Sequence, residues 1–471
     1  MIEGPRPYPA YKNSGQAWLG PVPQHWSVLP HRALFAEVLE REHPDEQMLS
    51  VTITQGVIKQ RQLLAGGSKK DGSKQDKSAY KLLCPGDLAY NKMRAWQGAL
   101  GISELRGIIS PAYVVQRLRA DGNPRYFHYL FRTPGFAKEA ERWSYGITSD
   151  MWSLRPEHFK AIYSAIPTGD EQAAIVRFLD HTIHRLDKAI RAKRKTIALL
   201  NEQKQAIIHR AVTRGLDPDM PLKDSGIPWL GQIPAHWDVW RIGRFARVGN
   251  GSTPSRARPD YWIGGTYPWL NSSQVNRACI DHADQFVTQA ALRECHLPRV
   301  PAGSVLVAIT GQGKTRGMAA VLEIESTINQ HLAFITPNAP IATPQFIHVA
   351  LSAAYQPLRA LSDDSGSTKG ALTCKDLKTF KIAIPPKHEQ ARLLTHIESE
   401  TRSLAKTSAR LGHEVDLLCE YRTRLIADVV TGQLDVREAA ARLTGEIEAP
   451  IEAQAEAAFA GIDEELAETE P

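Results

Sequence analysis

An internal repeat is the feature that most constrains the fold of this chain. The stretch SGQAWLGPVPQHWSVL, which begins at Ser14, returns as SGIPWLGQIPAHWDVW from Ser225, with nine of sixteen positions identical. Two further pairs follow in the same order: AIPTGDEQAAI matches AIPPKHEQARL from Ala383, and AVTRGLD matches VVTGQLD from Val429. Because a repeat marks a duplicated structural unit, the sequence predicts two copies of a unit of about 215 residues with similar borders and diverged middles.

The diverged middles, 27–165 and 238–383, are predicted to be mixed α/β domains. The segments DLAYNKM, SVLVAIT and AAVLEI have the apolar, β-branched character of strands. Turn-forming stretches such as CPGD, PAGS and SDDSGSTKG lie between them. A chain of 471 residues is too long for one core, and each middle has the size of one domain. We therefore expect an α+β fold.

A long helix is predicted after each EQ pair. From Glu171 to Arg214 the sequence contains neither proline nor glycine. Its apolar residues, with Lys193 and Lys204 filling two slots, recur at alternating steps of three and four, as in a coiled-coil seam. The seam residues are Leu179, Ile183, Leu186, Ile190, Ile197, Leu200, Ile207 and Ala211 in the first copy, and Leu393, Ile397, Leu404, Leu411, Val415, Leu418, Leu425 and Val429 in the second. Such a stripe must be buried. We expect an antiparallel pair with pseudo-two-fold symmetry; the alternative is that each helix packs on its own domain.

These observations divide the chain into five segments. The mixed domains cover 1–168 and 216–386, the long helices cover 169–215 and 387–439, and an acidic tail that we expect to be disordered covers 440–471. The tail carries nine acidic residues and one arginine, so its charge is −8; since the whole chain is +6, the remainder is +14. A body this basic favours a polyanionic partner.

No catalytic, metal or cofactor motif is complete. The stretch AITGQGKT resembles a phosphate-binding loop, but Ala308 stands where that motif needs glycine. The residues after it favour a turn and a strand over the helix that would hold phosphates. The four residues that could form a zinc set include no CxxC pair: Cys279, His282, Cys295 and His296. We expect no cofactor or metal in this chain, and a nucleotide-hydrolysing protein that uses Lys314 is kept as an alternative.

The expected location is the cytoplasm. The five cysteines are scattered and form no CxxC pair, which is typical of a reducing compartment. No apolar run reaches the roughly 18–20 residues of a membrane span, and the N-terminus lacks the order of a secretory signal.

Basic and polar loops in corresponding places of the two halves form a candidate DNA interface. Cations, hydroxyls and amides suit phosphate contacts, while arginine and glutamine suit base edges. The candidates are Lys69, Lys70, Lys74, Lys77, Lys92, Arg94 and Gln97 in the first half, and Ser252, Thr253, Arg256, Arg258, Gln312, Lys314, Arg316 and Lys369 in the second. The repeated tryptophans are instead expected to pack in the core: Trp18, Trp26, Trp229 and Trp237.

The chain resembles the specificity subunits of type I restriction–modification systems. The motifs that carry the resemblance are W-L-G-x-x-P-x-H-W, GDLAYNKMRAW, the paired IP…EQ, and TGQGKTRG…INQHLAFI followed by GSTKGALTCKDLK. The resemblance extends to about residue 440 and implies that each middle is a target-recognition domain for one half of a split, asymmetric site in double-stranded DNA. It also implies that the helices set the spacing and dock two modification subunits.

Those partners would use S-adenosylmethionine to methylate adenine, and restriction subunits would use ATP and Mg to translocate and cleave DNA. By this resemblance the chain itself is a non-catalytic specificity subunit with no membrane partner. A DNA-binding adaptor or regulator outside a restriction system remains the alternative.

Overall fold

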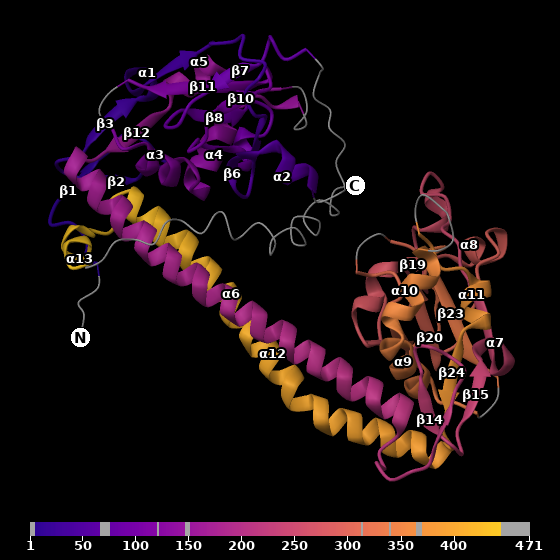
Figure 1. The fold of residues 1–471 in the computed structure, drawn as a ribbon. Coiled ribbons are helices and arrows are strands. Elements are labelled where there is room, and N and C mark those ends of the chain that lie inside the picture. The colour runs from indigo at the N-terminus through magenta and orange to yellow at the C-terminus, as the bar shows by residue number, and fades with distance from the viewer. Residues whose placement is uncertain are drawn as a thin grey trace. The chain divides into compact units, whose positions relative to one another are not determined.

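The computed structural model describes residues 5–65, 76–119, 122–146, 151–311, 314–338, 341–363 and 370–443. They form two compact units. The first contains the described residues up to Lys193 and from His413 onward, and the second is Arg194–Gly412. Each unit contains sheets, helices that cover them, and parts of two long helices (Figure 1). The fold class is α+β, as predicted.

The first unit is built on a four-stranded antiparallel sheet. Its strands, in spatial order, are β4 (Phe35–Val38), β11 (Tyr113–Leu118), β8 (Leu88–Asn91) and β9 (Leu100–Ile102). Two helices follow, α3 (Pro124–Phe131) and α4 (Pro134–Arg142). Each starts with proline after a residue whose side chain caps the first turn, Asn123 and Thr133. Their aromatic faces join Phe35 in the core.

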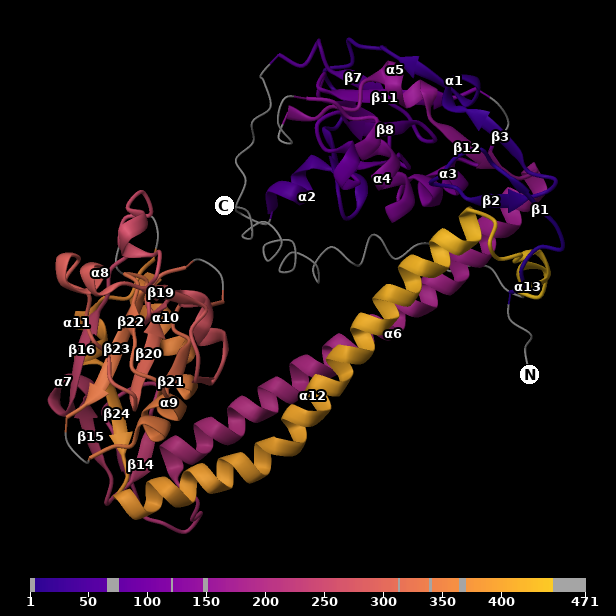
Figure 2. The same cartoon turned by 180° about the vertical axis from the view of Figure 1, so that it is seen from behind.

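The second unit repeats this sheet and adds a strand. Its strands, in spatial order, are β16 (Ala246–Asn250), β23 (Leu332–Pro337), β20 (Ser304–Ala308), β21 (Ala319–Leu322) and β18 (Cys279–Ile280). Helix α9 (Pro344–Ala353) packs on β20 and β21 (Figure 2), and α10 (Tyr355–Asp363) follows it. The order β4-β11-β8-β9 therefore corresponds to β16-β23-β20-β21, which confirms the predicted duplication.

The repeated border segments form matching small elements in both units. In the first unit these are β1 (Tyr11–Asn13), β2 (Pro21–Pro23), β3 (Ser27–Pro30), α1 (His31–Leu34), α5 (Pro156–Ala161) and β12 (Tyr163–Ile166). In the second they are β13 (Leu222–Asp224), β14 (Gln232–Pro234), β15 (Asp238–Arg241), α7 (Ile242–Phe245), α11 (Cys374–Thr379) and β24 (Lys381–Ile384). In each unit the first two strands pair with each other, and the third pairs with the last.

The two units differ in the segments inserted between these shared elements. The first has β5 (Leu49–Thr52), β6 (Gly56–Lys59), α2 (Gln60–Ala65), β7 (Lys81–Leu83), η1 (Ala95–Gln97) and β10 (Gly107–Ile109). The second has η3 (Pro259–Tyr261), β17 (Tyr267–Leu270), η4 (Ser272–Asn276), β19 (Gln285–Val287), α8 (Gln289–Glu294) and β22 (Thr327–Ile328). Divergence is thus concentrated in loops and side sheets around a common frame.

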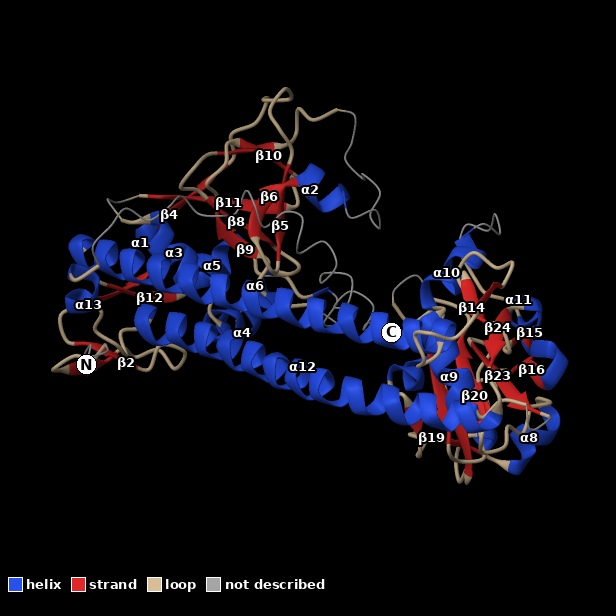
Figure 3. Cartoon of the chain, turned by 60° about the horizontal axis from the view of Figure 1, so that its bottom comes forward, coloured by secondary structure: helices blue, strands red, loops and turns tan. Residues whose placement is uncertain are grey.

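The two long helices are α6 (Gly169–Arg214) and α12 (Lys387–Val430), and they pack together (Figures 1 and 3). None of the sixteen predicted seam residues is exposed. Lys193 Nζ lies 2.5 Å from Glu414 Oε2, and Arg422 Nη1 lies 2.6 Å from Asp187 Oδ1. The helices therefore run antiparallel, because later residues of α6 meet earlier residues of α12.

Each helix also packs on globular cores at its ends, in addition to packing on the other helix. The core of the first unit includes Leu179 of α6 and Leu425 of α12. The core of the second includes Ile208 of α6 and Leu393 of α12. Both helices thus contribute to both cores.

The second helix is shorter than the predicted 387–439. It ends at Val430, and the turn that follows contains Gly432 with a φ of 78°, a left-handed conformation that glycine adopts readily. The short helix α13 (Arg437–Ala441) comes next, and Ala440 is completely buried. The first residue of the predicted tail is therefore packed, and the tail from 444 onward lies outside the described residues.

Candidate nucleic-acid interface

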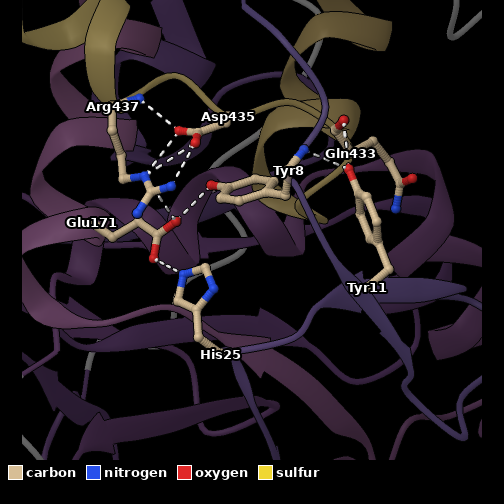
Figure 4. Close-up of polar contacts among 7 residues, drawn as sticks. All are labelled: Tyr8, Tyr11, His25, Glu171, Gln433, Asp435 and Arg437. Carbon is tan, nitrogen blue, oxygen red and sulfur yellow. Dashed lines mark hydrogen bonds and ion pairs between the residues drawn. The ribbon is translucent and has the colours of Figure 1, made fainter.

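The repeated motifs join one another through a buried glutamate in the first unit. The Glu171 carboxylate, 3% exposed, lies 2.6 Å from Tyr8 Oη and 2.8 Å from His25 Nε2 (Figure 4). Arg437 approaches the same carboxylate at 3.9 Å and is paired with Asp435 at 2.6 Å. Burial and the neighbouring Glu171 carboxylate raise the pKa of Tyr8. The cluster therefore ties the N-terminal segment, the start of α6 and the segment after α12 together.

The second unit repeats the histidine–glutamate contact of this cluster. Glu389 Oε1 lies 2.7 Å from His236 Nε2, and Glu389 Oε2 accepts a hydrogen bond of 2.8 Å from Trp237 Nε1. The glutamines of both EQ pairs donate to a preceding proline carbonyl at 3.0 Å, Gln172 to Pro167 and Gln390 to Pro385. The repeated border segments therefore have a structural role in both units.

The repeated tryptophans belong to the packing, as predicted. Trp26 and Trp237 are completely buried. Trp18 packs edge-on against Phe136, and Trp229 stacks on Phe380 with ring centroids 5.6 Å apart.

Loops of the same kind gather at one end of each main sheet. In the second unit, β16 and β20 lie on either side of the antiparallel β23, so the loops after β16 and β20 and before β23 meet there. In the first unit the loops after β4 and β8 and before β11 meet in the same way. We call this the loop end of the sheet. It carries most of the described candidate DNA contacts.

At the loop end of the first sheet, cations gather closely. Lys81, 6% exposed, donates from Nζ to the Tyr113 carbonyl at 2.7 Å. Burial lowers the pKa of Lys81; the nearby Glu37 carboxylate opposes this shift, and the charges of Lys92 and Arg41 add to it. Arg94 is exposed, and its charge lowers the otherwise raised pKa of Tyr113. Like charges held this close favour an anionic partner.

Sequence reasoning missed Arg41. It lies in the loop after β4, the loop that corresponds to the one holding Arg256 in the second unit. Lys77 and Gln97 are half-buried, and Gln97 ends the short helix η1. Three further candidates of the first half lie outside the described residues: Lys69, Lys70 and Lys74.

Two arginines of the second unit, Arg256 and Arg258, are both candidate DNA contacts but have different surroundings. The Arg256 guanidinium lies 3.7 Å from the ring centroid of Trp262 and donates to Gln285 Oε1 at 2.6 Å. Arg258 instead pairs with Asp260 at 2.5 Å and with Glu294 at 3.5 Å, and it lowers the pKa of Asp260. Within the described part of the chain Arg256 forms no ion pair. Its charge is therefore the one available to a ligand.

The candidate residues in the loop after β20 differ in their exposure to solvent. Lys314 is exposed, and its carbonyl accepts a hydrogen bond of 2.6 Å from Tyr355 Oη. Arg316 is only 4% exposed, so it lies beneath this surface. Gln312 and Lys369 lie outside the described residues. The strand β21 follows this loop, which confirms the predicted turn and strand and leaves no helix to hold a nucleotide phosphate.

The remaining candidates of the second half are Ser252 and Thr253, which occupy the loop after β16. The Ser252 amide donates to the Ile328 carbonyl at 3.0 Å, and the Ser252 carbonyl accepts from Trp269 Nε1 at 3.2 Å. Thr253 Oγ1 donates to Gln330 Oε1 at 2.5 Å. This loop is therefore held against β22 and the segment before β23.

Among the described residues, no three or more His, Cys, Asp or Glu side chains are grouped so that they could hold a metal ion. None of the helices within the described ranges is both long and apolar enough to cross a membrane.

Comparison with known proteins gives one family. Residues 234–408 match the family model described as the type I restriction modification DNA specificity domain. The chain is 23% identical over 180 residues to the type I restriction enzyme EcoR124I/EcoR124II specificity subunit of Escherichia coli, which covers 38% of this chain and 44% of that protein. It is 29% identical over 170 residues to the type I restriction enzyme MjaIX specificity subunit of Methanocaldococcus jannaschii, covering 35% and 38%. The chain thus aligns with less than half the length of these two relatives.

A solved structure supports the fold over a longer range. It was described under the heading of complex assembly and conformational transition of the type I R-M system. The match covers 88% of this chain and 99% of that chain, with a TM-score of 0.61 and 15% identity. This likeness shows the fold.

Proposed function

Because the chain belongs to the family of type I restriction–modification specificity subunits, we propose that it selects the DNA sequence on which such a complex acts. The observation that carries this proposal is the repetition of the loop end. Two sheets of the same strand order present cationic and polar loops at the same place, with Lys92 and Arg94 in one unit and Arg256 and Lys314 in the other. Two such surfaces suit a double-stranded target in two parts.

The physical roles of these residues differ. Lysines and the exposed arginines neutralise phosphates, which gives affinity without sequence information. Sequence is read by side chains that pair with base edges, and the diverged loops of the two units would provide different ones. Each unit is therefore proposed to read its own half-site. In this proposal the chain acts as a non-catalytic component of the complex.

The partners follow from the family. We propose that the paired helices α6 and α12, together with the frame around Glu171 and Glu389, present a surface to two modification subunits. These would carry S-adenosylmethionine, and restriction subunits would carry ATP and Mg. Exposed apolar side chains on the paired helices offer contacts for a protein: Leu199, Leu417 and Tyr421.

The test is to express the chain with a modification subunit of its own system in a bacterial host that lacks adenine methylation, and to map methylated adenines across the genome. We expect methylation at one bipartite sequence, and none when this chain is omitted. Exchange of residues 27–165 for the same region of a relative should change one half of the sequence and leave the other. Methylation that does not depend on this chain would contradict the proposal, and a change in both halves would contradict independent reading by the two units.

A further inference from the structure

A chain of four polar side chains crosses the loop end of the second sheet. Thr253 Oγ1 donates to Gln330 Oε1 at 2.5 Å, Gln330 Nε2 lies 3.2 Å from His331 Nε2, and His331 Nδ1 lies 2.7 Å from Thr310 Oγ1. Thr253 follows β16, Thr310 follows β20, and Gln330 and His331 precede β23. Three loops that are far apart in sequence are therefore connected through side chains at one place.

With the amide oxygen of Gln330 toward Thr253 and its nitrogen toward His331, the direction of each hydrogen bond in this network follows. An amide nitrogen only donates, so His331 Nε2 must accept from Gln330. The imidazole proton then lies on Nδ1 and is donated to Thr310 Oγ1. Thr253 in turn donates to the amide oxygen of Gln330. Both ends of the Gln330 amide thereby have a hydrogen-bond partner, Thr253 at one end and His331 at the other.

The backbone beneath Gln330 is anchored as well. Asn329 is 5% exposed; its amide donates to the Leu270 carbonyl at 2.9 Å, and its Oδ1 accepts from the His331 amide at 3.0 Å. The preceding carbonyl, that of Ile328, accepts from the Ser252 amide. Gln330 itself is exposed. A side chain that is exposed yet fixed from both sides loses little conformational freedom on binding.

Among the contacts between described residues, the amide of Gln330 keeps one donor and one acceptor unused. A primary amide has two N–H donors and an oxygen with two lone pairs, and His331 and Thr253 use one of each. One donor and one acceptor remain on the same planar group. This pair matches the N7 acceptor and the N6 amino donor that adenine presents in the major groove, which glutamine can bind in a bidentate manner.

We propose that Gln330 determines specificity in the half-site bound by the second unit by reading an adenine there, and that Thr253, His331 and Thr310 are positioning residues that hold its amide. This rests on the function proposed above. Arg256, which lies on the same loop as Thr253, supplies a neighbouring phosphate contact. The alternative role for Gln330 is purely structural: it would fasten the loop after β16 and touch no base.

The experiment uses the complete complex of this chain with its modification subunits and a duplex carrying the mapped bipartite site. Each adenine in the half-site of the second unit, on either strand, is replaced in turn by 7-deazaadenine, which removes N7 and keeps base pairing. We expect one position at which this replacement weakens binding about ten- to hundred-fold. The Gln330→Ala complex should bind the unmodified duplex more weakly by a similar factor, and replacement at that position should weaken it no further.

Controls separate this role from a structural one. Gln289→Ala, at another exposed glutamine of the same unit, should keep the wild-type response to 7-deazaadenine. Thr310→Val, at the far end of the polar chain, should weaken DNA binding. Replacement of the same adenine by 7-deazaadenine should still weaken the binding of this variant further. The melting temperature of each variant shows whether it folds, and the wild-type series with modified duplexes requires no variant at all.

Two outcomes would overturn the proposal in different ways. If no 7-deazaadenine position weakens wild-type binding, or if Gln330→Ala responds to each replacement as the wild type does, Gln330 reads no adenine, while DNA selection by the chain stands. If the wild-type complex methylates no bipartite site, the proposed function fails and the role of Gln330 fails with it.

Discussion

At the scale of single residues, the surroundings of a charge decide what it can bind. Arg256 and Arg258 stand two positions apart, and both suit DNA as residue types. Arg258 is compensated by Asp260 and Glu294, whereas Arg256 rests on the face of Trp262 and keeps its charge available. Asp260 is close to Arg258 in sequence, but Glu294 is far from it, so that part of the difference depends on the fold.

The corresponding prediction compares the two arginines in a salt titration. Arg256→Ala should weaken DNA binding by the complex and reduce the slope of log affinity against log salt by about one unit, because one phosphate contact is lost. Arg258→Ala should change the slope by much less. Equal effects of the two substitutions would mean that the ion pairs of Arg258 open when DNA binds.

A buried histidine gives a second prediction at this scale. His31 is completely buried among phenylalanine rings, with Nε2 2.8 Å from Ser164 Oγ. Burial lowers its pKa from 6.5 to about 3. The unfolded chain therefore takes up this proton at a higher pH than the folded chain does. The contribution of His31 to stability is complete above pH 6.5 and is lost progressively as the pH falls toward 3.

The repeat supplies the matched variant for this test. Ile242 and Ile382 occupy the corresponding positions of the second unit. In urea unfolding followed from pH 6.5 to 5, the His31→Ile, Ser164→Ile variant should lose less stability than the wild type, by about 1.4 kcal/mol per pH unit. His128, whose pKa is also lowered to about 3 by burial, should keep part of the acid sensitivity in both proteins. If the free energy of unfolding depended on pH in the same way in both proteins, protonation of His31 would not destabilise the folded chain.

At the scale of elements, local patterns were predictable and distant pairings were not. The seam of α6 and α12 could be predicted because its period is written in consecutive residues, and every seam residue is at least partly buried. The end of α12 was missed, since TGQLD carries only one weak helix-stopping residue, Gly432. The order of the two sheets joins strands far apart in sequence, and no short-range pattern specifies it. The polar chain through Gln330 was missed for the same reason.

Glycines test how tightly these elements are packed. A Cβ on Gly251, in the loop after β16, would lie 1.7 Å from the Ile328 carbonyl oxygen. Gly251→Ala should therefore destabilise the protein by more than about 2 kcal/mol and disturb the loop end of the second sheet. Gly412 in α12 has nothing within 4 Å of an added Cβ, so Gly412→Ala should stabilise by about 0.5–1 kcal/mol. Urea denaturation measures both, and a neutral Gly251→Ala would show that this loop can shift freely.

At the scale of the whole molecule, duplication accounts for the division between constant and variable parts. Glu171 contacts His25, and Glu389 contacts His236, the histidine of the second repeat. The same structural contact therefore occurs in both units. The inserted segments differ between the units, and they surround the loop ends that we propose to face DNA. A chain built in this way can change one reader while its frame and its other reader stay the same.

The paired helices make the spacing of the two half-sites a testable property. The contact between Lys193 and Glu414 marks a point where α6 and α12 lie together. Inserting one heptad after Ala192 and one after Glu414 keeps both seams in phase and lengthens each helix by about 10 Å. If helix length sets the spacing, the gap in the methylated sequence should grow by about three base pairs, at 3.4 Å each, while both half-sites keep their sequence. A heptad in α6 alone would leave its seam without a partner and should reduce methylation. Full activity of the double insertion at the original spacing would mean that the helices do not set this distance, and new half-site sequences would mean that the helices themselves read bases.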